Sequence, residues 1–114
     1  MLNNTLIKKI ILPSLFAVSL YATGEAHKGQ TFYYYLLKSK LGYDGSAFAK
    51  QHTDKQWIHL FQNNSKDLKI KLLKENTNLK SLLYSKKFDE ISPHLEAFVI
   101  EYASNKKNAP VCIE

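Results

Sequence analysis

Apolar side chains recur along this chain at the spacing of helical turns, and this period constrains the fold more than any other feature. The clearest stripe occupies positions i, i+3, i+4 and i+7 of one helix face: Leu95, Phe98, Val99 and Tyr102. Ser92 and Pro93 precede it, and a serine cap followed by proline is typical of a first helical turn. The sequence therefore predicts a closing helix that starts at Ser92, with Phe88 and Ile91 packed just before it.

Residues 53–56 indicate a second helix start. Thr53 and Gln56 fit a capping box, in which the threonine hydroxyl accepts from the amide of Gln56 and the glutamine side chain reaches back. Behind this cap, Trp57, Leu60 and Phe61 form a compact apolar stripe. We therefore expect a helix that runs to about residue 62.

Residues 63–65, Asn-Asn-Ser, are expected to form a loop that interrupts the helical pattern. Leucines resume at helical spacing after this loop and predict two further short helices: Leu68, Leu72 and Leu73, then Leu79, Leu82 and Leu83. Ile70 lies off the first of these faces. Because residues 68, 70 and 72 also alternate with a period of two, a strand remains the alternative there.

The segment before these helices contains three consecutive tyrosines. We expect residues 23–28 to be a flexible start and residues 29–42 to be helical, with Phe32, Tyr35 and Leu36 on one face and Gly42 as the stop. Consecutive tyrosines also suit a strand. A helix is preferred because the sequence offers no second strand to pair with it.

These patterns together predict an all-α fold of four to six helices in a single small domain. The core is expected to contain the larger apolar side chains of the stripes: Phe32, Trp57, Phe61, Leu95, Phe98 and Tyr102. A lone cysteine excludes a disulfide framework, so stability must come from helix packing, a ligand or a partner.

The N-terminus is typical of an export signal. Lys8 and Lys9 precede an apolar stretch, residues 10–22, whose length suits a signal peptide and falls short of a membrane span. We expect cleavage after residue 22 or 24, which makes residues 1–22 a signal peptide and residues 23–114 the folded domain. The expected location is the periplasm or the outside of the cell, without stable membrane insertion after cleavage; an uncleaved anchor is the alternative.

The positive charge is carried entirely by lysine. The chain has 16 lysines, no arginine and 10 acidic residues, for a formal net charge of +6. Arginine is the residue suited to bidentate recognition of phosphates and bases, whereas lysine acts as a hydrated point charge. We therefore expect a protein partner with an acidic surface and no nucleic-acid partner; the oligomeric state stays open.

The side chains that carry chemistry are few. The sequence has no HExxH pattern, no Gly-x-Ser-x-Gly elbow, no phosphate-cradling glycine loop and no paired carboxylates, so we expect no enzyme, no metal site and no catalytic residues. His27 lies in the expected flexible start, and the weak candidates for a cofactor ligand are His52, His59 and His94. Cys112 is a possible thiol site, or a small apolar residue packed under the core.

The two ends of the chain resemble small bacterial c-type cytochromes, which are exported helical domains of about this length. Gly29, Phe32 and Tyr33, followed by Gly42, are similar to the first helix of that family, and the stripe from Leu95 resembles its closing helix. The Cys-x-x-Cys-His haem motif is missing from the positions where it should stand: Leu37, Lys40 and Leu41. The family's methionine ligand is missing too, because the one methionine is the initiator.

The resemblance implies a haem-less cytochrome c-like domain in which Trp57 and the tyrosines at 33–35 fill the space of the cofactor. The expected function is then a non-enzymatic accessory or interaction protein without a cofactor. Two alternatives remain: a small electron-transfer protein that binds haem or a metal through non-covalent ligation by His52, His59 and His94, and a thiol-dependent partner protein that works through Cys112.

Overall fold

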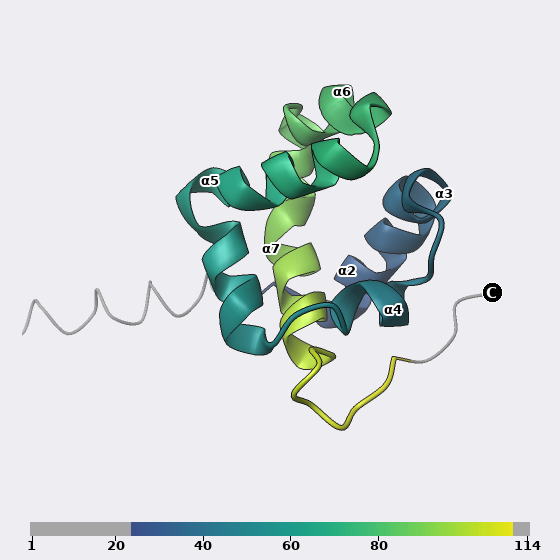
Figure 1. Ribbon diagram of the computed structural model, residues 1–114, viewed down its shortest axis with the longest axis vertical. Helices are drawn as coiled ribbons and strands as arrows, with labels where there is room; N and C mark the ends of the chain where they lie inside the picture. The colour runs from purple at the N-terminus through teal and green to yellow at the C-terminus, as the bar shows by residue number, and fades with distance from the viewer. Residues whose placement is uncertain (1–23, 111–114) are drawn as a thin grey trace, which may run out of the picture.

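The computed structural model describes residues 24–110, and within that range all regular secondary structure is helical, with no strand. The elements follow one another with short connections (Figure 1): α2 (Ala26–Phe32), η1 (Tyr33–Leu37), α3 (Lys38–Leu41), α4 (Gly45–Ala49), α5 (Asp54–Glu75), η2 (Thr77–Leu79), α6 (Lys80–Leu83) and α7 (Lys86–Glu101). The predicted all-α class is confirmed. The expected signal peptide, residues 1–22, and Cys112 lie outside the described residues.

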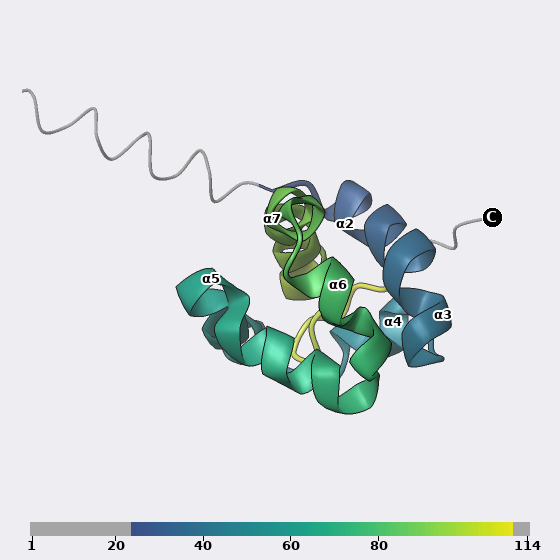
Figure 2. The same cartoon turned by 90° about the horizontal axis from the view of Figure 1, so that it is seen from above.

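α2 crosses α7 at very close range, and the two helices lie side by side in both views (Figures 1 and 2). Gly29 stands at the crossing, where a Cβ would come within 2.7 Å of the Phe98 Cβ and closer still to the His94 carbonyl. Just before α2, the backbone N–H of Glu25 donates to Nδ1 of His94 at 2.9 Å. The expected flexible start at residues 23–28 is therefore wrong for residues 24–28, because Glu25 is bonded to α7 and α2 begins at Ala26.

The first long helical segment contains a π-helical turn, and this turn changes which tyrosine faces the core. The wider turn of η1 follows Phe32, so positions 29, 33 and 37 fall on one face at a spacing of four residues. Tyr33 and Leu37 are buried, whereas Tyr35 is 66% exposed. The expected inward position of Tyr35 is therefore wrong. Gly42 ends the segment in the left-handed conformation, as predicted, with φ of 91°.

α5 begins at the predicted capping box and bends sharply at its middle (Figure 1). Thr53 Oγ1 accepts from the Gln56 N–H at 3.2 Å, and the Gln56 side chain accepts from the Thr53 N–H at 2.9 Å. The predicted interruption is confirmed at residues 63–65, which all have positive φ. Leu68 and Leu72 are buried beyond it and Ile70 is exposed, so the helical alternative is correct and the strand is wrong.

α7 begins at Lys86, earlier in the sequence than the predicted start at Ser92. Ser85 is the cap, since its hydroxyl accepts from the Phe88 N–H at 3.2 Å, and Pro93 lies inside the helix. The apolar stripe extends backward from Leu95 through Ile91 to Phe88, all three buried, and this packing stabilises the helix across the proline. The predicted start at Ser92 is therefore wrong.

Aromatic side chains fill the centre of the fold. Trp57 is fully buried and donates through Nε1 to the carbonyl of Ala49 at 2.8 Å, while the Phe48 ring lies 5.0 Å from Trp57 and 4.7 Å from Tyr33. Four of the six expected core side chains are buried: Trp57, Phe61, Leu95 and Phe98. The other two, Phe32 and Tyr102, are partly buried and pack against this core.

Candidate functional site

Two of the candidate histidines line the same surface pocket at the start of α5. His52 and His59 border a shallow depression of about 420 Å³ together with three residues of the helix: Lys55, Gln56 and Leu60. His59 is exposed and lies 3.6 Å from the carboxylate of Asp67. The pocket is therefore a candidate ligand site with two imidazoles at its edge.

His52 is the more constrained of the two. Its ring meets the Trp57 ring edge-on at 4.8 Å, and its Nε2 is enclosed without a hydrogen-bond partner among the described residues. Burial holds the pKa of His52 below its ordinary value, and the nearby charge of Lys71 lowers it further, against a smaller opposing effect of Gln56. The fold therefore favours the neutral imidazole.

The remaining histidines lie elsewhere. His94 accepts the Glu25 N–H through Nδ1 and borders a separate pocket of about 370 Å³ between α2 and α7. His27 is exposed on α2. Within residues 24–110, no three side chains of histidine, cysteine, aspartate or glutamate come together as a metal-binding group.

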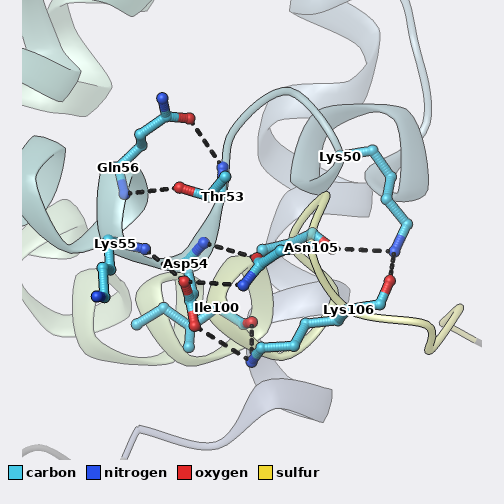
Figure 3. Close-up of polar contacts among 9 residues, drawn as sticks. Lys50, Thr53, Asp54, Lys55, Gln56, Ile100, Asn105 and Lys106 are labelled. Carbon is cyan, nitrogen blue, oxygen red and sulfur yellow. Dashed lines mark hydrogen bonds and ion pairs between the residues drawn. The ribbon is translucent and has the colours of Figure 1, made fainter.

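A polar network joins the start of α5 to the chain after α7 (Figure 3). The Lys50 ammonium donates to three main-chain carbonyls, those of Ala103, Lys106 and Asn108, at 2.9 to 3.3 Å, and Figure 3 draws the bond to Lys106. Asp54 bonds to Asn105 through its backbone N–H and its carboxylate, and the Lys106 ammonium lies 3.8 Å from that carboxylate. Because every member is satisfied by the protein, this network anchors the C-terminal segment and offers nothing to a ligand.

A second network of hydrogen bonds joins η1, the turn at Tyr43 and the end of α5. Tyr33 donates to the carbonyl of Tyr43 at 2.6 Å, Tyr43 donates to Glu75 at 2.5 Å, and Lys71 donates to the same carboxylate at 2.8 Å. Burial and the bonded Glu75 raise the pKa of Tyr43 to about 12. Burial alone would raise the pKa of Glu75, but the bonds from Lys71 and Tyr43 outweigh it and the pKa is lowered. Near neutral pH, Tyr43 therefore stays protonated and Glu75 stays charged, and their hydrogen bond holds the end of α5 against the turn at Tyr43.

The lysines are distributed unevenly. Residues 24–110 carry 14 lysines against nine acidic side chains, a net charge of +5. Residues 66–87 hold seven of those lysines and two of the acids, and therefore the whole excess. We call this segment the lysine end; it comprises the second half of α5, η2, α6 and the start of α7, which lie together at the top of Figure 1. The total net charge, from which the acidic partner was predicted, does not reveal this segregation.

One lysine of this end is buried. Lys69 is 5% exposed, and its ammonium lies over the rings of Tyr84, at 5.0 Å, and Phe88, at 5.8 Å. Tyr84 itself is 60% exposed. Position 69 belongs to the buried face that also holds residues 65, 68 and 72, at helical spacing. The sequence spacing alone thus places Lys69 beside the buried leucines, and this spacing could have predicted its burial.

Comparisons of the chain with protein-family models, curated proteins and solved structures find no match. The class that the fold defines is a small all-α domain with an aromatic core, closed by the crossing of α2 and α7. None of the helices within residues 24–110 combines the length and the apolarity that a membrane span requires.

Proposed function

We propose that this chain is a non-enzymatic, exported protein of the periplasm or the cell exterior, a haem-less cytochrome c-like accessory domain that works through protein contacts. The crossing of α2 and α7 at Gly29 supports the likeness to that family. The absence of a haem is supported by the packing at the centre of the fold, where the rings of Trp57, Phe48 and Tyr33 lie against one another at 1% exposure or less.

The observation that carries the interaction role is the segregation of charge. A net +5 confined to residues 66–87, with equal numbers of lysines and acids in the rest of the described chain, gives the molecule one strongly positive end. Such a charge distribution steers association with a negatively charged partner and orients the encounter. The partner expected from this chemistry is a protein with an acidic surface.

The test uses protein purified from the exported fraction of its host cell. Its absorbance spectrum should lack a Soret band, and cross-linking in intact cells should yield a discrete heavier adduct. Formation of that adduct should be suppressed when the cells are exposed to high salt before cross-linking, because salt screens exposed charges. A strong Soret band, or cross-linking that yields no adduct, would contradict the proposal.

A second candidate is a small haem- or metal-binding electron-transfer protein with non-covalent histidine ligation. One observation favours it: His52 and His59 border the same pocket. Titration with ferric haem and with Zn²⁺ should then give a spectral change or bound metal that His52→Ala removes. His27→Ala, on exposed α2, is the matched control; identical behaviour of the two variants counts against this candidate.

A further inference from the structure

Lys69 is the one buried lysine among the described residues, and its ammonium has no acceptor. Lys50 donates to three carbonyls and Lys71 to Glu75, whereas no oxygen of the described residues accepts from Lys69. An ammonium removed from water costs free energy unless it is paired or hydrogen-bonded, and aromatic rings compensate it only in part. The fold alone therefore does not account for a cation at this position.

The Lys69 ammonium remains open to a ligand. The one described side-chain atom that is fully enclosed without a partner is Nε2 of His52, so Nζ of Lys69 keeps an opening to the surface. Tyr84 stands beside this opening, 60% exposed, with the Lys69 ammonium over one face of its ring. A shielded cation next to an exposed tyrosine combines the groups that favour a desolvated contact at the centre of an interface.

We propose that Lys69 and Tyr84 form a carboxylate-binding site, at which an aspartate or glutamate of an acidic protein partner docks on the lysine end. The carboxylate would accept from the Lys69 ammonium, which is bonded to no other oxygen, and the Tyr84 hydroxyl can donate a second hydrogen bond. The surrounding lysines supply long-range attraction, while this pair supplies the short-range contact. This inference rests on the proposed function and names the site within it.

An acidic protein fits this end better than an anionic membrane does. A helix that binds a membrane surface needs a broad apolar face, and the large apolar side chains exposed in residues 66–87 are two, Ile70 and Tyr84. Lysine without arginine also lacks the bidentate geometry that suits lipid phosphates. Binding to an anionic membrane is therefore the competing result that the experiment must exclude.

The experiment measures binding of a fluorescent oligoglutamate peptide to the full exported protein by anisotropy at low salt. Lys69→Met removes the ammonium and keeps the apolar stem, and it should weaken binding about tenfold or more, since a hydrogen bond to a charged group is lost. The matched control is Lys38→Met. Lys38 also lies over a tyrosine ring, at 4.9 Å from Tyr34, but outside the lysine end, so the affinity should change less than about twofold.

Tyr84→Ala is a second variant on the exposed side of the site, where substitution leaves the core intact, and it should also weaken binding. Circular dichroism checks that each variant is folded. Equal affinities of Lys69→Met and Lys38→Met overturn the site, as does tighter Lys69-dependent binding to anionic lipid vesicles than to the peptide. If the peptide does not bind while the cross-linked adduct persists in cells, this site is wrong and the proposed function stands.

Discussion

The crossing of α2 and α7 gives the sharpest test of the fold, through the substitution Gly29→Ala. The added Cβ would stand 2.6 Å from the carbonyl carbon of His94 and 2.7 Å from the Cβ of Phe98. Real Cβ atoms essentially never come within 3.0 Å of such neighbours, and the nearest one, the carbonyl oxygen of His94, lies at 2.0 Å, so α2 must retreat from α7 by about 1 Å there. Neither neighbour can rotate away, because one is main chain and the other is fixed to it.

The expected cost follows from this geometry. Overpacking a well-packed contact costs about 1–3 kcal/mol, and a clash with main chain belongs at or beyond the upper end, at about 3–4 kcal/mol. Alanine is favoured over glycine inside a helix by about 1 kcal/mol, which offsets part of this cost. The net loss is then about 2–3 kcal/mol. For a domain of this size, each kcal/mol lowers the Tm by about 4–8 °C, so we expect a drop of roughly 10–20 °C.

Thermal and urea unfolding followed by circular dichroism measure this loss. The matched control is His27→Ala, an exposed position on the same helix, where the change in unfolding free energy should stay within about 0.5 kcal/mol. If Gly29→Ala is as stable as His27→Ala, the two helices do not meet as described.

Three further predictions concern the core and its polar anchors. Trp57→Phe removes the indole N–H that bonds Ala49 and leaves a small cavity, so urea unfolding should show a loss of about 2–4 kcal/mol. Lys50→Met frees the three carbonyls that the ammonium bonds, so amide hydrogen exchange should accelerate in residues 104–109, and unchanged exchange would refute the anchor. The pKa of His52 is lower in the fold than when unfolded, so protonation favours the unfolded chain. Stability should therefore fall as the pH drops below about 6.5, and His52→Gln should flatten that dependence.

Local chemistry made parts of this fold predictable. The capping box of Thr53 and Gln56 depends on two side chains and the backbone beside them, so its sequence spacing is sufficient to find it. Gly42 ends its helix because a residue without Cβ tolerates φ of 91°. The buried positions Leu68 and Leu72 followed from the helical period alone.

Features set by distant parts of the chain were not predictable in this way. A regular α-helix carries Phe32 and Tyr35 inward, but the π-helical turn at Tyr33–Leu37 buries Tyr33 and Leu37 and exposes Tyr35 instead. Ser92 and Pro93 have the chemistry of a helix start, yet the earlier stripe from Phe88 extends the helix through them. For the site, the lysine excess of residues 66–87 and the place of Lys69 on the leucine stripe can be read from the sequence, whereas the contact of its ammonium with the Tyr84 ring depends on how the helices pack.

The last prediction compares two neighbouring lysines on α5. Lys71→Met removes the partner of Glu75 and should lower the unfolding free energy by about 1 kcal/mol, because that pair is partly shielded from solvent. Lys69→Met removes an ammonium without an acceptor; the lost ring contacts cost about 0.5–2 kcal/mol, and the relief of desolvation is at least as large. Its unfolding free energy should therefore be unchanged or higher in urea titrations. A loss larger than that of Lys71→Met would show that Lys69 stabilises the fold through its two rings, and the reason for assigning it to a partner would disappear. If Lys69→Met instead leaves the stability unchanged and weakens peptide binding, Lys69 serves the interface, whereas Lys71 serves the fold.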